Sequence, residues 1–238
     1  MDEPRYAIYF VPPADADIYR FGAGFLGYDC YTGEELGAPH DIGVEAPAWD
    51  ELTREPRRYG FHATLKAPFH LTPSFAESDL AGELRRFAVI PRTLPSILPA
   101  IRSLDRFVAV VPAAPSVAVD RLAADCVMAF DRFRRALSAQ ERQQRLASGL
   151  TARQAKNLER WGYPFVFEEF RFHMTLTGPI VRERRDAIRT LLQKRFDAID
   201  GARQPLAIAR LALLRQEDRS TPFRVVLQAD LTALRPQR

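Results

Sequence analysis

Cysteine and long apolar runs are scarce in this chain, and both absences narrow the class of protein. The 238 residues include only two cysteines, Cys30 and Cys126, and neither stands in a Cys-x-x-Cys or Cys/His spacing. We expect both thiols to be reduced and structural, which suits a cytoplasmic protein. No apolar run reaches membrane-spanning length and the first residues show no signal-peptide pattern, so no membrane contact is predicted.

Familiar phosphate-binding and nucleophile motifs are missing too. The sequence has no Gly-x-x-x-x-Gly-Lys-Ser/Thr loop, no GxGxxG and no GxSxG, and its four histidines form no close cluster with acidic residues or cysteines. We therefore predict neither a metal site nor a cofactor. The composition is that of an ordinary globular protein, 47% hydrophobic and 27% charged, and the net charge of +4 suits an anionic ligand.

One five-residue pattern, Phe-His-x-Thr-Leu, occurs twice, at residues 61–65 and 172–176. Both stretches are rich in aromatic and β-branched residues, which favours strands. Because successive strand side chains point to opposite faces, the phenylalanines and leucines of the pattern are expected to be buried. The opposite faces each carry an imidazole, a hydroxyl and a cation, namely His62, Thr64 and Lys66 in the first, and His173, Thr175 and Arg171 in the second. Two such faces brought together would form a basic groove with a histidine on each wall.

The order of the predicted elements indicates an α+β fold. Besides the two motifs, strands are expected over 5–11, 96–103, 106–111, 205–215 and 223–227, and helices over 15–26, 73–87, 117–137, 138–160 and 182–196. Residues 27–56 are rich in Gly and Pro, which predicts loops.

Each motif is followed by a helix and two strands, so the chain has the pattern of a duplicated unit. We predict a single bilobal domain over 1–238, with lobes of about 5–112 and 117–230. It would contain two pseudo-symmetric antiparallel sheets, with helices on the outside and a central groove. Whether the lobes exchange elements stays open.

A pair of histidines can divide acid–base work near neutral pH. A neutral imidazole removes a proton from an attacking hydroxyl or water, and a protonated one gives a proton to the leaving oxygen. The threonine two residues along can donate a hydrogen bond to a phosphate oxygen. We therefore predict four catalytic residues, His62, Thr64, His173 and Thr175, and leave open which histidine is the acid.

Four further residues are candidates for substrate binding. Lys66 and Arg171 extend the histidine faces and could stabilise phosphate charge. Tyr59 and Tyr163 lie beside the motifs and could stack on a base or ribose, although packing is the commoner role for such aromatic residues.

Other polar residues have a plain structural interpretation. A lone histidine is more often a satisfied structural residue than a catalyst, and we interpret His70 in that way and His40 as a solvated loop residue. The arginine-rich run 132–145 is typical of a solvated helical face. The role of the wider region 132–160 stays open.

The two His-x-Thr motifs, with residues 59–69 and 170–178 around them and the opening stretch 5–12, resemble the 2H phosphoesterase superfamily. It includes RNA 2′-5′ ligase-like proteins and cyclic nucleotide phosphodiesterases. The chain is most similar to a bacterial branch of uncharacterised proteins associated with phosphonate utilisation. The resemblance covers nearly the full chain, implies a bilobal α+β fold with a central groove, and carries catalytic roles onto the two histidines and two threonines of the motifs.

Three functions are open at this point. The first is a metal-independent hydrolase that opens a cyclic phosphodiester on ribose, or on a small phosphorylated sugar or nucleotide; phosphonate metabolism enters through the resemblance alone. The second is RNA end processing or 2′-5′ ligation, in which the partner is an RNA end. The third is a binding module that holds a nucleotide or an RNA end without turnover. The sequence does not specify the oligomeric state.

Overall fold

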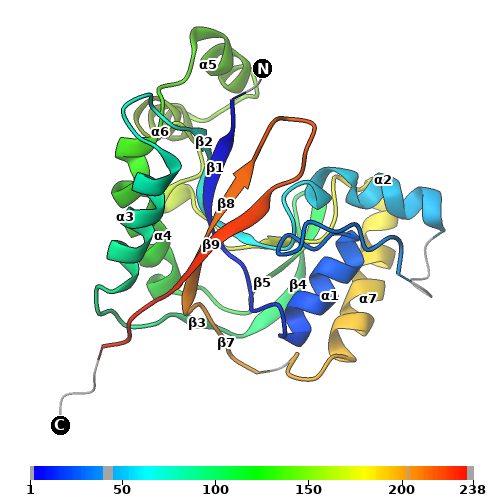
Figure 1. Cartoon of the computed structure of the whole chain (residues 1–238). Coiled ribbons are helices and arrows are strands. Elements are labelled where there is room, and N and C mark those ends of the chain that lie inside the picture. Colours follow the sequence, from blue (N-terminus) through cyan, green and yellow to red (C-terminus); the bar gives the residue numbers. More distant parts are fainter. Residues whose placement is uncertain (1–2, 40–44, 203, 235–238) are drawn as a thin grey trace.

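The computed structural model describes residues 3–39, 45–202 and 204–234 (Figure 1). Its elements are, in chain order, β1 (Arg5–Phe10), α1 (Asp17–Leu26), α2 (Ala46–Arg57), β2 (Ala63–His70), α3 (Glu77–Ala88), β3 (Ser96–Ile97), β4 (Pro99–Leu104), β5 (Phe107–Pro112), α4 (Val117–Phe130), η1 (Asp131–Phe133), α5 (Ala139–Leu146), α6 (Ala152–Trp161), η2 (Phe167–Glu169), β6 (Met174–Thr175), α7 (Arg182–Asp197), β7 (Leu206–Ala207), β8 (Arg210–Gln216) and β9 (Arg224–Asp230). The predicted α+β class is confirmed. His40, expected in a loop, lies outside the described residues.

Seven strands form one antiparallel sheet in the order β4-β5-β6-β2-β1-β8-β9, and β3 pairs with β7 in a second sheet of two strands. The predicted antiparallel sheets are confirmed, but their division is corrected, because both motif strands lie in the sheet of seven strands. The two motif strands, β2 and β6, are neighbours and join what would otherwise be two sheets. A free sheet edge exposes unpaired backbone groups, and this pairing removes such an edge from each part.

The helices pack on two different regions of the sheet. α3 and α4 contact β2, β8 and β9, whereas α7 contacts β4 and β5. Figure 1 shows these two groups on opposite sides of β1. The hairpin β4–β5 precedes the second motif in the chain yet pairs with it, and the hairpin β8–β9 at the end of the chain pairs with β1. The predicted lobe boundaries and the symmetry between lobes stay predictions.

The apolar sides of both motifs form part of one buried core. The two phenylalanines and two leucines of the pattern, Phe61, Leu65, Phe172 and Leu176, are all buried, as strand alternation predicts. Cys30 and Cys126 are buried and unpaired as well, in agreement with structural thiols. The core therefore holds each His-x-Thr segment from beneath.

The structure corrects one stretch of predicted loop. Helix α2 occupies the last part of residues 27–56 and ends one residue beyond it, with Pro47 in its first turn and Pro56 in its last. A proline in the first turn costs no helical hydrogen bond, because the N–H groups there have no partner within the helix. Pro47, one of the residues that suggested a loop, marks the start of a helix instead.

Candidate active site

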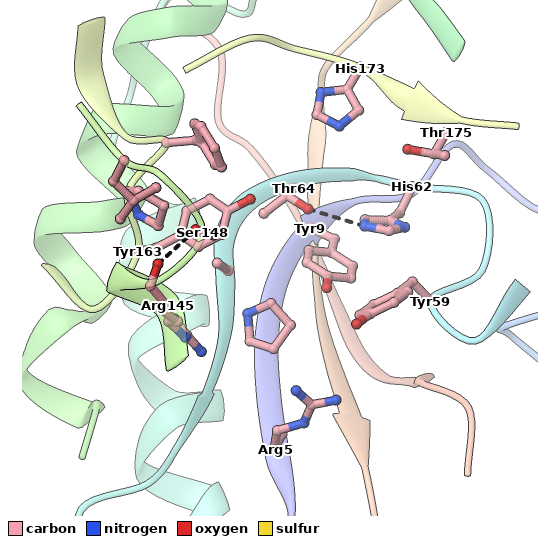
Figure 2. Close-up of a pocket in the computed structure, with 15 residues that line it drawn as sticks. Arg5, Tyr9, Tyr59, His62, Thr64, Arg145, Ser148, Tyr163, His173 and Thr175 are labelled. Carbon is pink, nitrogen blue, oxygen red and sulfur yellow. Dashed lines mark hydrogen bonds between the residues drawn. The ribbon is translucent and has the colours of Figure 1, made fainter. Parts of the chain in front are cut away.

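The two motifs run antiparallel and in register at the centre of the sheet. Their middle residues, Ala63 and Met174, are paired, and both are fully buried. The residues on either side of this pair point to the other face of the sheet. There the register places each histidine across from the threonine of the other motif. The two histidines are therefore diagonal neighbours across the strand pair, and the backbone positions of such neighbours lie about 7–8 Å apart. The fold therefore brings both His-x-Thr motifs to one surface (Figure 2).

Each imidazole is held by the carbonyl two residues before it. Nδ1 of His62 lies 2.9 Å from the oxygen of Gly60, and Nδ1 of His173 lies 2.7 Å from the oxygen of Arg171. A carbonyl oxygen can only accept a hydrogen bond, so Nδ1 carries the hydrogen in both rings. Nε2 is then the atom of each ring that exchanges protons. The sequence contains the matching motifs but gives no sign of this matched tautomer.

The backbone and a ring stack fix the orientation of His62. Gly60 has a φ of +71°, and a Cβ there would lie 2.7 Å from Cβ of Cys30, so only glycine fits this turn. The His62 ring stacks on Tyr9 with centroids 3.8 Å apart and an interplanar angle of 19°. Its Nε2 lies 3.2 Å from Oγ1 of Thr64. The imidazole is therefore held on one face and at both nitrogens.

Burial lowers the pKa of both histidines. For His62 the pKa falls from 6.5 to about 4; the hydrogen bond to Gly60 acts against the shift, and the charge of His173 adds to it. For His173 burial also lowers the pKa, and the hydrogen bond to the Arg171 carbonyl opposes this. Both rings are consequently neutral at pH 7 in the free protein. An anion bound between them would raise both pKa values, because it stabilises the imidazolium form.

A cavity of about 390 Å³ opens on this face of the sheet. Both histidines and both threonines of the motifs line it, and Tyr59 and Tyr163 contribute to its wall. A second hollow of about 340 Å³ shares Tyr59, His62, His173 and Thr175 with the first. The structure thus gathers six of the eight predicted site residues around one cavity; the exceptions are Lys66 and Arg171.

Lys66 does not line the cavity, which corrects the prediction from strand alternation. Thr64 pairs with Tyr9 and Lys66 pairs with Ile8, so β2 has one extra residue between two pairs that are adjacent on β1. Such a β-bulge shifts the alternation of side chains by one position. Lys66 is therefore only 3% exposed, and its Nζ lies 2.8 Å from Oδ1 of Asp131. Burial alone would raise the pKa of Asp131, but hydrogen bonds from Arg134 and Lys66 outweigh it and lower that pKa.

We expect Lys66→Ala to lower the free energy of unfolding by about 2–4 kcal/mol, because it removes one partner of a buried ion pair. Asp131 keeps Arg134 and Arg160 as partners, which limits the loss. Turnover per folded molecule should stay within a few-fold of wild type. Urea denaturation and steady-state rates measure both quantities, and Lys66→Met, which keeps the buried stem, is the matched control. A 100-fold loss of turnover with unchanged stability would show that Lys66 takes part in the reaction.

Arg171 is also directed away from the cavity. Its Nη1 donates to the carbonyl oxygens of Glu168 and Phe170, at 3.0 and 2.7 Å, and its side chain is exposed. The expected strand over the second motif is limited to Met174 and Thr175. Strand alternation therefore does not hold at residue 171, and Arg171 does not share the face of His173.

The cavity also contains residues that the sequence did not indicate, among them Arg5, Tyr9, Arg145 and Phe165. Arg5 and Tyr9 belong to one face of β1, where alternation places residues 5, 7 and 9 together. Arg145 ends the arginine-rich run that was expected to be a solvated face. The periodicity of β1 could have revealed the first pair once β1 was known to adjoin the first motif, but no local signal identifies Arg145.

Among the described residues, no group of three or more His, Cys, Asp or Glu side chains is arranged to hold a metal ion. In the same part of the chain, the helices are too short or too polar for any of them to span a membrane. The polar groups that the structure gathers at the cavity are imidazoles, hydroxyls and guanidinium groups.

Several solved structures resemble the chain over most of its length at low identity. LigT of E. coli in complex with NADP+ is 16% identical, with a TM-score of 0.42, and the match covers 98% of this chain and 99% of LigT. A conserved protein of unknown function from Agrobacterium tumefaciens str. C58 is 12% identical, with a TM-score of 0.46, over 95% of this chain and 86% of its own. At TM-scores below 0.5, these likenesses carry no argument about activity.

Similarity in sequence is clearer. Two curated proteins named Ribose 1,5-bisphosphate phosphokinase PhnN, from Janthinobacterium sp. (strain Marseille) and Laribacter hongkongensis (strain HLHK9), are 37% and 34% identical to this chain. The matches cover 92% and 98% of this chain but 49% and 54% of those proteins, so the chain spans about half the length of these relatives. Residues 64–224 match the model of a family described as "Protein of unknown function (DUF1045)". The match takes in well over half of the chain, and the chain therefore belongs to the DUF1045 family.

Proposed function

We propose that this chain is a phosphoesterase that hydrolyses a cyclic phosphodiester on ribose, or on a small phosphorylated sugar or nucleotide, without a metal ion. The observation that carries the proposal is the matched pair of imidazoles. In each ring Nδ1 is bound to a carbonyl, so Nε2, which in His62 lies 3.2 Å from Oγ1 of Thr64, is the atom that can exchange protons, and both rings line the same cavity. Such a pair can remove a proton from water and donate one to a leaving oxygen on either side of one phosphorus.

In this proposal His62 is the base and His173 the acid. The pKa of His62 is the one lowered to about 4, so its Nε2 is free of a proton at neutral pH. Nε2 of His62 takes a proton from water, and the water oxygen bonds to phosphorus. The bond from phosphorus to one ring oxygen breaks, and that oxygen takes the proton from Nε2 of His173, which carries one because the bound anion raises the pKa of this imidazole. Thr64 and Thr175 donate hydrogen bonds to the non-bridging oxygens, and proton exchange with solvent restores both imidazoles.

The size of the cavity and the names of the relatives support a small substrate. A volume of about 390 Å³ lies near the lower end of small-molecule pockets, roughly 300–1,000 Å³. The curated relatives are named for ribose 1,5-bisphosphate. Opening a 5-phosphorylated ribose 1,2-cyclic phosphate at O2 would yield that compound. We therefore place the reaction before a kinase step on ribose bisphosphate, within phosphonate utilisation, as the resemblance implies.

A panel of cyclic phosphates tests the proposal. Ribose 1,2-cyclic phosphate, its 5-phosphorylated form and nucleoside 2′,3′-cyclic phosphates are incubated with the protein, with and without EDTA, and ring opening is followed by ³¹P NMR. We expect turnover of at least one ribose cyclic phosphate that EDTA leaves unchanged. Binding of all of them without turnover would replace the proposal by a binding module. Competition by long RNA at low concentration would favour RNA end processing instead.

The pH dependence should be bell-shaped, with both limbs on the acid side of the usual histidine range. For unphosphorylated ribose 1,2-cyclic phosphate, kcat/KM should fall below about pH 4, where His62 becomes protonated and no longer acts as base. It should also fall as the pH rises through the lowered pKa of His173, below 6.5, where the acid is lost. The limbs of kcat should lie higher, because the bound anion raises both pKa values. A rate that rises steadily from pH 6 to 9 would contradict this pair.

A further inference from the structure

Two arginines lie in the same cavity, away from the reacting end. Arg5 comes from β1, and Arg145 comes from α5. In Figure 2 both lie in the lower part of the pocket, whereas His173 and Thr175 lie in its upper part, and Tyr9 stands between them. The cavity therefore has a cationic end in addition to its imidazole end.

Neutral oxygens hold both guanidinium groups. Nε of Arg5 donates to Oε1 of Gln216 at 2.8 Å, and Nη1 of Arg145 donates to the carbonyl oxygen of Gly162. The amide nitrogen of Gln216 donates to the carbonyl of Thr221 at 2.7 Å, which turns its oxygen toward Arg5. Within the described residues, neither Arg5 nor Arg145 has a carboxylate within ion-pair distance. Their positive charges are thus fixed in place but not neutralised.

Neighbouring arginines show the contrast. A small hollow of about 20 Å³ that adjoins the two guanidinium groups is also lined by Arg134, Arg135 and Arg219. Each of these three is paired with an acid, namely Asp131, Glu3 and Glu141. The two arginines that reach the larger cavity are the ones of this cluster left without such a partner. An unpaired guanidinium in a concave site is the usual arrangement for binding phosphate or carboxylate.

The electrostatics favour an anion at this end of the cavity. Burial lowers the pKa of Arg145; the charge of Glu141, on the same helix, acts against this shift, and the positive charge of Arg5 adds to it. Two like charges that repel across a cavity cost free energy, and an anion between them would offset that cost. Tyr163 lines the same cavity. Burial raises the pKa of its phenol, and the positive charge of Arg145 acts against this shift.

The distance from the imidazole end sets the size of the ligand. Arg5 and Tyr9 lie on one face of β1, and Tyr9 is paired with Thr64 of the first motif. Arg5 lies four residues before Tyr9, which corresponds to about 13 Å along the strand. The lengths of the Arg5 side chain and of the motif side chains reduce the distance between the groups that they hold. Two anionic groups held at the two ends would therefore be separated by something of the size of one sugar, not by a direct pyrophosphate link.

We propose that Arg5 and Arg145 form a second anion subsite, which binds a terminal phosphate of the substrate while the histidines act on its cyclic phosphate. The inference rests on the proposed function, since it assigns the imidazole end to the phosphate that reacts. It selects one substrate class among those still open: a small sugar cyclic phosphodiester that carries a second phosphate.

A matched pair of substrates tests the subsite. Ribose 1,2-cyclic phosphate and its 5-phosphorylated form are compared by kcat/KM at constant ionic strength. The wild-type protein should prefer the 5-phosphorylated form by about 10–100-fold, the range expected for charge-assisted hydrogen bonds. Arg145→Gln and Arg5→Gln should each bring this ratio toward one, mainly through KM, and Arg145→Lys should restore part of it. Arg153→Gln is the matched control, because Arg153 is an exposed arginine on the neighbouring helix α6 and lines none of these hollows.

Binding of ribose 5-phosphate, measured by calorimetry, separates the subsite from the proposed function. Tighter binding to wild type than to Arg145→Gln, with no turnover of any cyclic phosphate, would support the subsite and overturn the function. Turnover of both cyclic phosphates with equal kcat/KM would support the function and overturn the subsite. An equal loss in Arg145→Gln on both substrates would also overturn it, because a general structural effect does not depend on the second phosphate.

Discussion

Replacing either His62 or His173 by alanine should lower kcat by about 10²–10⁴-fold, the usual contribution of a general acid or base. Each imidazole has its own role, so one cannot take over the work of the other. The effect should fall on kcat more than on KM, because the hydroxyls of Thr64 and Thr175 and the guanidinium groups at the other end still bind the anion. The double variant should be little worse than either single variant, since both act in one step.

His70→Ala provides the matched control for these variants. His70 belongs to the same strand as the first motif and also has its Nδ1 near a backbone carbonyl, 3.1 Å from the oxygen of Pro4. It does not line the cavity of the paired histidines. Its loss should leave kcat within about three-fold of wild type, since no proton-transfer role is lost.

Circular dichroism and urea denaturation should show His62→Ala folded, with the free energy of unfolding reduced by about 1 kcal/mol for the lost stack on Tyr9. A wild-type rate in either His62→Ala or His173→Ala would contradict the acid–base mechanism.

Gly22→Ala should both destabilise the protein and slow it, although it lies on α1 and outside the cavity. A Cβ at Gly22 would lie 2.2 Å from Cγ of Phe61, which is fully buried directly before His62. No contact of that length is tolerated, so Phe61 must move. We expect the free energy of unfolding to fall by about 2–3 kcal/mol, as for other overpacked cores. A displaced His62 should lower kcat by about 10–100-fold, because small errors in position are costly for catalysis.

The same helix offers an internal control. Gly24 lies two residues further along α1, and a Cβ there would meet nothing within 4 Å. Gly24→Ala should therefore raise the free energy of unfolding by about 0.5–1 kcal/mol, the gain in helix propensity alone. Opposite signs for the two variants in the same urea experiment support the contact with Phe61. Equal effects would mean that the packing of α1 on the first motif is not what positions His62.

Local patterns in the sequence predicted the motifs well and their surroundings less well. Alternation correctly buried Phe61 and Leu65 and placed His62 and Thr64 on the other face, because each of these positions follows the regular period of a strand. It failed at Lys66, one residue past a bulge. A bulge depends on how β2 fits against β1, which is a relation between strands that no single stretch of sequence contains.

The sheet of seven strands could not be inferred from element order either. Chain order suggests that β4–β5 completes the first half and β8–β9 the second, yet each hairpin pairs with the other half. Both arrangements use the same local propensities, and long-range packing decides between them. Arg145 was missed for a related reason: a polar helix has the periodicity of a solvated face, and only its docking beside Tyr163 brings the last turn to the cavity.

The central claim is that both imidazoles act on one phosphorus, and a crystal structure with inorganic phosphate tests it most directly. We expect one anion between the motifs, with different oxygens about 2.6–3.2 Å from Nε2 of His62 and from Nε2 of His173. The hydroxyls of Thr64 and Thr175 should donate to the same anion, and both Nδ1 atoms should keep their carbonyl partners. An anion that touches one histidine alone, or rings turned so that Nδ1 faces the anion, would contradict the paired mechanism.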